Sequence, residues 1–385
     1  MPETAIVAGS VAQRPNAGGH TWVFLQYLLG FRDLGWDAIL LDRLEPDMCT
    51  DPSGAPCPVE SSVNFLYLQD VLRRFGLTDS YALLYDDGAR CLGMSRDDLL
   101  ERVSRSALLL NVNGFIADEQ VLERSNLRAF LDIDPGFGQM WRELGLHDPF
   151  VGHDVYVTIG ENIGQPDCEI PTGGIDWVTT AQPVVLEHWP VQPRGGEAFT
   201  SVVSWRGPAA PVVYRDKTYG LRVHEFRKFA SLPKLSSERF EVALEIHPAD
   251  QADADLLRSN GWALVDPASV ARDPWSYRDY VQRSTAELMI AKNMYVESRS
   301  GWFSDRSICY LASGKPVLAQ DTGFSRLYGP GEGLVAFNDL DEAAAGAEAI
   351  ASDYEAHCRA ARDLAEEHFD SRKVLSRLTS RLGIT

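Results

Sequence analysis

The opening of the chain constrains its fold more than any other segment. An apolar run at residues 5–8 leads into a loop rich in Gly, Pro and Asn, and a stretch with helical apolar spacing follows at residues 20–34. Gly35 ends that stretch, and a second apolar run occupies residues 38–41. Two strands joined through one helix over this length pair in parallel through a right-handed crossover. The sequence therefore opens with a strand-helix-strand unit of an α/β sheet.

The same alternation continues along the chain in two blocks. Further apolar runs of the first block occur at residues 81–85, 107–112, 129–133, 155–159 and 177–178. Residues 183–196 are rich in Pro and Gly and interrupt the pattern as a linker. The runs of the second block occur at 199–205, 240–246, 263–265, 287–290 and 316–319. A chain of 385 residues is longer than a domain with a single hydrophobic core usually is, so we expect two open α/β domains joined near the linker at 183–196. Ligands bind such sheets at the carboxyl ends of their strands, which predicts a site in the cleft between the domains. A long charged helix from about residue 354 is expected to close the chain.

Charge and composition exclude several classes of partner. The formal net charge is −19, which repels nucleic acids and anionic membranes at long range. Residues 1–4 lack the basic start of a signal peptide, and the most apolar stretch, residues 20–34, is interrupted by polar and charged residues. The six cysteines form no Cys-x-x-Cys pair, which favours free thiols in a reducing compartment. We expect a cytoplasmic protein without an integral membrane segment.

Residues 298–323 carry the strongest indication of a ligand site. Small residues at Ser300 and Gly301 precede a helix, so a ligand can approach the backbone closely there. The free amide groups and the dipole at a helix start favour an anion such as a diphosphate. Arg299 and Arg306 are placed to add charge-assisted hydrogen bonds. The segment therefore predicts a diphosphate site.

A purely structural interpretation of this segment is also open. Ser304 followed by Asp305 is an ordinary way to cap a helix start, and it needs no ligand. The negative charge of Asp305 would compete with a bound phosphate. Physical chemistry alone leaves the two interpretations evenly matched.

The segment resembles the donor-binding signature of glycosyltransferases that have the GT-B fold. Gly314-Lys315-Pro316-Val317 matches its closing part, and Ser300-Gly301-Trp302 resembles the turn that holds the donor diphosphate. Asp321 and Thr322 stand where the family often contacts sugar hydroxyls. The sequence departs from the pattern at Cys309, where the family usually has a glutamate that holds the ribose.

This resemblance implies an architecture and a set of donor-binding residues. It implies two Rossmann-like domains facing each other across a cleft, at residues 1–192 for the acceptor and 193–355 for the nucleotide sugar, with a C-terminal helix at 356–385 that returns to the first domain. It is closest to bacterial enzymes of secondary metabolism or cell-surface glycan assembly. The donor would be UDP- or TDP-linked, with no further cofactor and no metal. The implied donor-binding residues are Gly19, Ser204, Arg206, Asp266, Arg299, Ser300, Gly301, Trp302, Ser304, Asp305, Asp321 and Thr322.

The first strand-to-helix loop holds the candidate catalytic base. Gly18 and Gly19 permit close approach of a substrate, and His20 would start the helix at the cleft. An imidazole with an ordinary pKa of about 6.5 accepts a proton near neutrality. Many inverting GT-B enzymes carry a histidine base in this loop, and Gly19-His20 resembles that arrangement. The alternative is that His20 only orders the loop, and retaining members also have glycines here, so the stereochemistry stays open.

A histidine base needs a carboxylate to orient it. Asp118, Asp132 and Asp134 follow strands of the first domain, and we select Asp118 and Asp134 as catalytic candidates beside His20. Asp132-Ile133-Asp134 also matches the metal-binding D-x-D of the other large glycosyltransferase fold, but that fold has a single domain. An acidic loop closed by Pro135-Gly136 is the plainer interpretation of this segment.

Two loops of the second domain complete the predicted donor site. Ser204 and Arg206 end its first strand, where GT-B enzymes commonly contact donor phosphates, and Arg206 can donate two hydrogen bonds. Asp266 with Pro267 falls where the family holds the base. Both are also ordinary turn sequences.

We therefore expect a glycosyltransferase that transfers a hexosyl or deoxyhexosyl group to a small-molecule or glycan acceptor. A nucleotide-sugar epimerase on the same fold is the alternative. A nicotinamide-dependent oxidoreductase is less favoured because the first loop lacks Gly-x-Gly-x-x-Gly, and a sugar-binding protein without activity is also weighed. The acceptor and the oligomeric state, with a homodimer as one option, are left open by the sequence.

Overall fold

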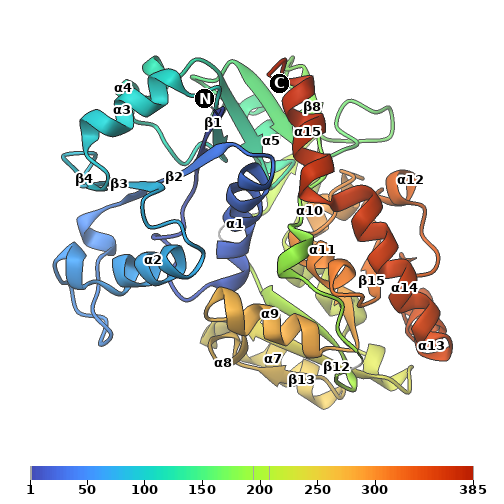
Figure 1. Ribbon diagram of the computed structural model, residues 1–385. Coiled ribbons are helices and arrows are strands. Elements are labelled where there is room, and N and C mark those ends of the chain that lie inside the picture. The colour runs from blue at the N-terminus through green and yellow to red at the C-terminus, as the bar shows by residue number, and fades with distance from the viewer. Residues whose placement is uncertain (1, 194, 208, 385) are drawn as a thin grey trace.

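The computed structural model describes residues 2–193, 195–207 and 209–384. It shows two sheets, each flanked by helices, that face each other across the middle of the molecule (Figure 1). The predicted α/β class with two Rossmann-like domains is confirmed. Within the described part of the chain, no helix is both long and apolar enough to cross a bilayer.

The first sheet has eight strands among the described residues, in the order β4-β3-β2-β1-β5-β6-β7-β8. Neighbouring strands are parallel throughout, except that β4 runs antiparallel to β3. The central strand β5 is buried along its whole length, because helices cover both faces of the sheet. The bounds are β1 Thr4–Ala8, β2 Asp37–Leu44, β3 Tyr81–Tyr85, β4 Arg90–Gly93, β5 Leu108–Val112, β6 Arg128–Asp132, β7 Val155–Thr158 and β8 Trp177–Thr179.

Helix α1 (Gly18–Asp33) is the most buried helix of the first domain. It is covered by its own sheet, by α9 (Pro274–Arg283) of the second domain and by the C-terminal helix α15 (Ser371–Arg381), so residues 21–31 are buried all round. The side chains of Ser62, Ser95 and Asp118 cap three other helices of this domain by accepting backbone N–H bonds. The remaining bounds are α2 Val63–Arg74, α3 Arg96–Arg105, α4 Glu119–Arg124 and α5 Phe137–Glu143.

The second sheet has six parallel strands among the described residues, in the order β13-β12-β9-β14-β15-β16. A separate antiparallel hairpin, β10–β11, follows β9 and was not expected from the sequence. The bounds are β9 Ala198–Ser204, β10 Val212–Tyr214, β11 Lys217–Tyr219, β12 Arg239–Glu245, β13 Ala263–Val265, β14 Ala286–Met289, β15 Val317–Gln320 and β16 Leu334–Phe337. The helices of this domain are α6 Arg222–Phe226, α7 Gln251–Ser259, α8 Pro267–Val270, α9 Pro274–Arg283, α10 Asn293–Glu297, α11 Asp305–Ala312, α12 Ser325–Tyr328 and α13 Leu340–Ser352.

The end of the chain returns to the first domain, as predicted, but not as a single helix. Helix α14 (Tyr354–Leu364) passes through a π-helical turn at Ala365–Phe369, and Asp370 then caps a separate helix, α15 (Ser371–Arg381). Val184 holds this corner, because its N–H donates to Phe369 O (2.7 Å) and its carbonyl accepts from Ser371 N (2.9 Å). Helix α15 then packs on α1, where Gly30 leaves room for Leu375.

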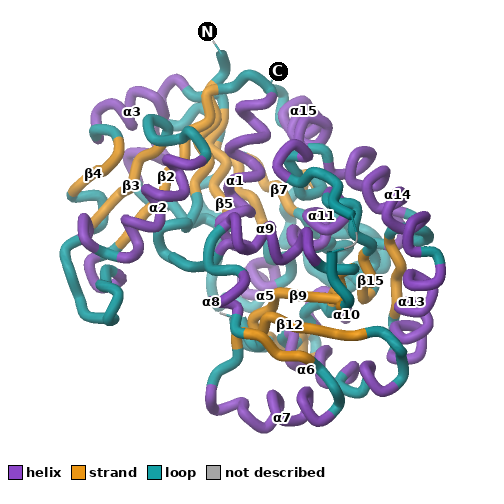
Figure 2. The backbone as a smooth tube through the Cα atoms, turned by 60° about the horizontal axis from the view of Figure 1, so that its bottom comes forward, coloured by secondary structure: helices purple, strands orange, loops and turns teal. Residues whose placement is uncertain are grey.

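The sheet orders predict where a ligand binds. In the first sheet the chain leaves β1 in one direction through β2 and returns on the other side through β5, and β9 has the same position between β12 and β14. At such switch points the loops diverge and leave a crevice at the carboxyl ends of the strands. Helix α1 lies against α9 across the domain boundary (Figure 2), which brings the loop after β1 next to the end of β9.

Candidate functional site

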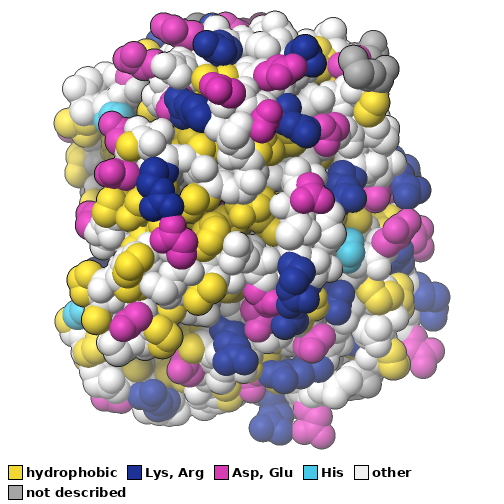
Figure 3. Space-filling model, turned by 60° about the vertical axis from the view of Figure 1, so that its left-hand side comes forward, with side chains coloured by type: hydrophobic (Ala, Val, Ile, Leu, Met, Phe, Trp, Pro, Cys, Tyr) yellow, Lys and Arg dark blue, Asp and Glu magenta, His cyan; other side chains and the backbone are white. Residues whose placement is uncertain are grey.

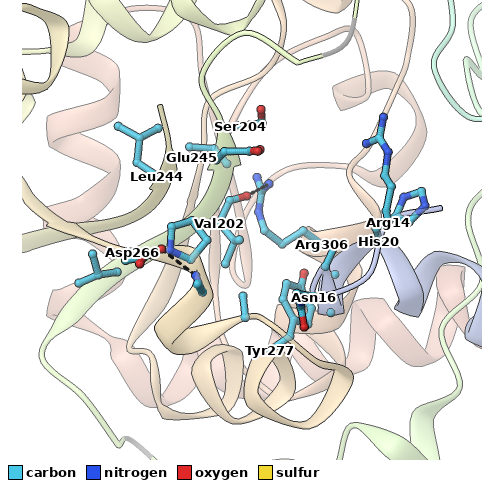
Figure 4. Close-up of a pocket in the computed structure, with 18 of the residues that line it drawn as sticks. Arg14, Asn16, His20, Val202, Ser204, Leu244, Glu245, Asp266, Tyr277 and Arg306 are labelled. Carbon is cyan, nitrogen blue, oxygen red and sulfur yellow. Dashed lines mark hydrogen bonds between the residues drawn. The ribbon is translucent and has the colours of Figure 1, made fainter. Parts of the chain in front are cut away.

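A cleft of about 1150 Å³ lies between the two domains, and both switch points open into it. Residues 13–20 of the first loop form one wall, and the carboxyl ends of β9, β12 and β13 form the other. Helix α8, Arg258, Tyr277 and the first two residues of α11 complete the lining. In Figure 4, Leu244 and Asp266 lie at one side of the cavity, Arg14 and His20 lie at the other, and Ser204, Glu245 and Arg306 lie between them.

Arg306 is the buried cation of this cleft. Its side chain is 8% exposed, its Nε donates to the buried Glu287 carboxylate, and its Nη1 donates to Val202 O at 2.9 Å. Its Nη2 is buried without a hydrogen-bond partner. Burial by itself lowers the pKa of Arg306, but the ion pair with Glu287 outweighs burial and holds that pKa above its ordinary value. A charged guanidinium group therefore has an unused donor beside the cleft.

A second guanidinium group lies close to the first. Arg222 donates through Nε to Ile290 O (3.2 Å) and through Nη1 to Ser204 O (3.3 Å). Burial, together with the neighbouring charge of Arg306, lowers the pKa of Arg222 to about 10. Arg222 is not among the residues that line the cleft, but its charge adds to the positive potential around Arg306. The sequence did not indicate Arg222, because an arginine in the first turn of a short helix carries no motif.

His20 lies in the opposite wall as predicted, and it is neutral. Its Nε2 lies 3.1 Å from both Ser10 O and Ser10 Oγ, and in the tautomer whose Nε2–H donates to the carbonyl oxygen, Nδ1 is an acceptor. Burial and the charge of Arg14 lower the pKa of His20 to about 4. The groups that orient the imidazole are thus the carbonyl and hydroxyl groups of Ser10 and not a carboxylate.

The first loop is held in place by a buried carboxylate at the end of β2. Asp42 accepts from Ala12 N (2.7 Å) and from Arg43 N (2.7 Å). Burial raises the pKa of Asp42 to about 7. Asp42 therefore positions the segment from which Gln13 and Arg14 reach the cleft.

The two glycines of the first loop approach the second domain more closely than was expected. Gly18 N donates to Ala271 O at 2.8 Å, and a Cβ on Gly18 would lie 2.1 Å from Asp273 O. A Cβ on Gly19 would lie 2.9 Å from the ring of Tyr277. Both glycines line the cleft, but their lack of a side chain is required by the contact between domains.

The expectation that the amides of Ser300 and Gly301 hold a diphosphate is wrong. Ser300 N donates to Tyr295 O (3.2 Å), Gly301 N donates to Thr322 O (2.8 Å) and Trp302 N donates to Ser300 Oγ (3.2 Å). A Cβ on Gly301 would lie 2.8 Å from Asn162 of the first domain. This turn is therefore used for packing between the domains, and its amides are already paired.

The other residues chosen from this segment lie outside the cleft lining, with Asp305 as the exception. Arg299 pairs with Asp167 (3.5 Å), the Asp321 carboxylate accepts from Gly323 N (2.9 Å), and Thr322 Oγ1 donates to Trp302 O. Ser304 caps α11 by accepting from Arg306 N (3.2 Å), as the structural interpretation stated. Across residues 298–323, all of which the structure describes, Asp305 and Arg306 reach the cleft.

The predicted carboxylate partners of His20 are bound elsewhere. Asp118 caps α4 and forms an ion pair with Arg96 at 2.8 Å. Asp134 forms an ion pair with Lys292 of the second domain (2.7 Å) and accepts from the Tyr295 hydroxyl. Both lie outside the cleft lining, so the predicted dyad with His20 is not formed.

The polar groups of Asp132 and Arg206 are also bonded within the protein. The Asp132 carboxylate is buried and accepts from Gln139 Nε2 (2.6 Å) and Thr158 Oγ1 (2.8 Å), which accounts for the D-x-D pattern without a metal ligand role. Arg206 is paired in bidentate fashion with Asp250 at 2.7 and 2.5 Å and lies outside the cleft lining, so its predicted phosphate contact is not supported.

Ser204 and Asp266 line the cleft at the ends of β9 and β13. One oxygen of Asp266 caps α8 by accepting from Ala268 N at 2.9 Å. Whether either residue contacts a donor stays a prediction. Glu245, at the end of β12, also lines the cleft and was missed, because a single glutamate at a strand end has no sequence signature.

No protein-family model matches the chain, and a search of the curated proteins finds no match. Solved structures do match along its whole length. An alpha-glucosyltransferase in complex with UDP and a 13-mer DNA aligns over 100% of both chains, with TM-score 0.59 and 11% identity. HepE from Anabaena, in complex with UDP and glucose, aligns over 99% of both, with TM-score 0.58 and 10% identity.

AviGT4, described as a glycosyltransferase involved in avilamycin A biosynthesis, aligns over 99% of this chain and 97% of its own, with TM-score 0.54 and 11% identity. The chain has the GT-B fold. In GT-B terms, the cleft is the space between the two Rossmann-like domains, and the resemblance noted in residues 298–323 is confirmed at the level of architecture.

Proposed function

We propose that this chain is a glycosyltransferase that binds a nucleoside-diphosphate sugar in the interdomain cleft. The observation that carries the proposal is Arg306, a nearly buried guanidinium group that lines the cleft and whose buried Nη2 has no hydrogen-bond partner, with Arg222 beside it. An unpaired buried donor costs free energy, on the order of 1–3 kcal/mol, and a phosphate oxygen would recover that cost. The GT-B fold and the whole-length similarity to UDP-bound structures support the same assignment.

The two arginines suit the leaving group of such a reaction. When the sugar departs, negative charge develops on the diphosphate, and Arg306, a fixed cation that lines the cleft, lowers the barrier without reorganising, with the charge of Arg222 behind it. Guanidinium groups supply that charge directly, so we propose that transfer needs no metal ion. Arg306 is kept in position by Glu287 and Val202, which limits the freedom it loses on binding.

The first loop suits the sugar and the acceptor. Arg14 and His20 line the cleft from the first domain, and Arg306 lines it from the second (Figure 4). The pKa of His20 is about 4, so it is neutral at pH 7 and its Nδ1 accepts a hydrogen bond from a hydroxyl group. We propose that His20 receives the acceptor hydroxyl or a sugar hydroxyl in this way.

We propose a small-molecule or glycan acceptor and a hexosyl or deoxyhexosyl group as the transferred sugar. One similar structure holds DNA, but a net charge of −19 opposes binding of a polyanion. The face in Figure 3 has acidic and basic side chains intermixed, with apolar side chains gathered across its middle.

The decisive experiment measures nucleotide release from a panel of UDP-, TDP- and GDP-sugars, with and without candidate acceptors and with and without EDTA. We expect acceptor-dependent release that EDTA does not abolish. Arg306→Gln should weaken nucleoside-diphosphate binding about tenfold to a hundredfold. Arg206→Gln is the matched control, since Arg206 is an exposed arginine of the same domain outside the cleft lining.

Three results would contradict the proposal. If no nucleoside diphosphate raises the melting temperature of the chain, the cleft is not a donor site. If Arg306→Gln and Arg206→Gln weaken nucleoside-diphosphate binding equally, Arg306 does not hold the diphosphate. Conversion of a nucleotide sugar into its epimer without any acceptor would establish the epimerase instead.

A further inference from the structure

A short antiparallel loop follows β2, and its residues lie outside the cleft lining. Thr50 forms an isolated antiparallel bridge with Pro56, and Asp51 N donates to Ala55 O at 2.8 Å. The Asp51 carboxylate accepts from Ser53 N (2.8 Å) and from Ala55 N (3.1 Å). The tip of the loop is exposed. The turn is therefore held in one conformation by its own hydrogen bonds, although it projects into solvent.

This register places two cysteines directly opposite each other. With Thr50 across from Pro56, the next pair of the ladder is Cys49 and Cys57, and Cys57 N donates to Cys49 O at 3.1 Å. Opposite residues of such a hydrogen-bonded pair have Cα atoms about 5.5 Å apart and side chains on the same face. A disulfide bond spans Cα atoms that are about 4.4–6.8 Å apart. The ladder therefore holds the two cysteines at a spacing that a disulfide bond can bridge.

The two thiols differ in exposure, and both are free in this structure. Cys49 is fully buried, and its Sγ donates to Glu45 O over 3.7 Å, a weak contact that a rotation about Cα–Cβ breaks at little cost. Cys57 is partly exposed. Burial raises the pKa of Cys49, and the neighbouring Cys57 raises it further. An oxidant in solution therefore meets Cys57 first, and Cys49 lies behind it.

We propose that Cys49 and Cys57 form a thiol–disulfide exchange site, in which a low-molecular-weight disulfide such as oxidised glutathione produces a disulfide bond within the chain. The Cys57 thiolate attacks one sulfur of oxidised glutathione, forms a mixed disulfide and releases one glutathione thiolate. The Cys49 thiolate then attacks the Cys57 sulfur, forms the Cys49–Cys57 bond and releases the second glutathione thiolate. The chain loses two electrons and two protons, which oxidised glutathione gains as it becomes two molecules of glutathione.

The bond would fasten a segment that supports the first loop of the cleft. Thr50 O accepts from Val63 N (2.8 Å) at the start of α2, and Asn64 of the same helix donates to Ala12 O (2.9 Å), one residue before the cleft lining begins at Gln13. A covalent link across the loop removes conformational freedom from the unfolded chain. Oxidation should therefore raise the melting temperature by a few degrees, and reduction should reverse the effect.

The test incubates the folded chain with oxidised glutathione and then counts free thiols in denaturant. The count should fall by two from the six of the reduced chain, and dithiothreitol should restore it. A peptide map should show residues 49 and 57 joined, with the loss of two hydrogen atoms. Cys57→Ser should keep all its remaining thiols, and its melting temperature should not respond to oxidised glutathione.

Cys91→Ser is the matched control, because Cys91 is also partly exposed but lies opposite Leu84 in the sheet. It should lose two thiols on oxidation and gain the same melting temperature as the wild type. A lasting mixed disulfide between Cys57 and glutathione, disulfide bonds between chains, or an unchanged thiol count would overturn the exchange site. A Cys49–Cys57 bond that leaves the melting temperature unchanged would overturn its role in fastening the loop. None of these outcomes depends on nucleotide binding, so they are independent of the proposed function.

Discussion

The turn at residues 299–302 and the start of α11 at residues 304–306 are adjacent in sequence, yet they serve different purposes. In the turn, Gly301 packs against Asn162 and its amide is bonded to Thr322 O. At the start of α11, Arg306 lines the cleft, and its buried Nη2 has no hydrogen-bond partner. One stretch joins the domains, and the other faces the ligand.

This difference shows what a small-residue turn before a helix does and does not reveal. Small residues indicate that some group approaches the backbone closely. They do not say whether that group is a phosphate or another part of the same chain. Here Asn162 takes that place, since its Nδ2 donates to Arg299 O and to Gly323 O, each at 3.1 Å.

The largest expected effect on stability comes from a substitution that removes the ion-pair partner of Arg306. Glu287→Ala should lower the free energy of unfolding by about 3–5 kcal/mol, because it leaves the buried Arg306 charge unpaired. It should also weaken nucleoside-diphosphate binding, since Arg306 loses the carboxylate that orients it. Thermal and urea unfolding check the first effect, and calorimetry with UDP checks the second. A variant as stable as the wild type would show that Glu287 does not support Arg306.

A substitution in the turn should lower stability without changing UDP binding. Gly301 has a φ of +73°, and a Cβ there would lie 2.8 Å from Asn162. Gly301→Ala should therefore cost about 2–4 kcal/mol, through strain in the left-handed conformation and overpacking. The folded fraction should bind UDP as the wild type does. If Gly301→Ala binds UDP more weakly but is as stable as the wild type, the turn contributes to the donor site.

The opposite wall of the cleft gives a pH-dependent effect. The pKa of His20 is lowered to about 4 from the ordinary 6.5, so between these values the unfolded chain binds a proton that the folded chain does not. His20 therefore costs stability progressively as the pH falls from 6.5 to 4 and has no such effect above 6.5. At pH 5 the cost is about 2 kcal/mol.

His20→Gln removes this titration, so the loss of stability between pH 7.5 and pH 5 should be smaller by about that amount. Urea unfolding of both chains at the two pH values measures the difference. Identical pH dependence in the variant and the wild type would mean that the imidazole titrates normally in the folded chain.

The smallest expected effect tests the bridge between the domains. Asn162→Ala removes two hydrogen bonds to carbonyl groups, and we expect a loss of about 1–2 kcal/mol in stability with UDP affinity unchanged. Calorimetry and thermal unfolding on the same sample separate the two quantities. If UDP affinity falls instead, the bridge controls the width of the cleft.

The elements of the fold were largely evident from local pattern. The apolar runs at residues 5–8 and 38–41 became β1 and β2, and the helix between them became α1, because buried parallel strands need continuous apolar sequence. The long helix expected after residue 354 is broken at Asp370, where the bond between Val184 and Phe369 turns the chain onto α1. That turn depends on a contact between residues far apart in sequence, which no local pattern reveals.

The candidate site was predicted in part. His20, Gly19, Ser204, Asp266 and Asp305 lie at the cleft, and Arg306 was expected as an anion ligand. The predicted roles were wrong for Asp118, Asp134 and Arg206, because each side chain has an ion-pair partner from a distant segment. Arg222, Glu245 and Glu287 were missed, since each is a single charged residue without a motif.

The sequence by itself determined two α/β domains, the parallel order of their first strands and the segments that border a cleft. Those properties follow from apolar periodicity and from the glycines and caps that end helices, which act over a few residues. Only the tertiary structure decided which polar groups remain free for a ligand. That outcome depends on whether the fold places a partner from a distant segment beside the polar group. Asn162 packs against Gly301, whereas no group of the described chain bonds to Arg306 Nη2.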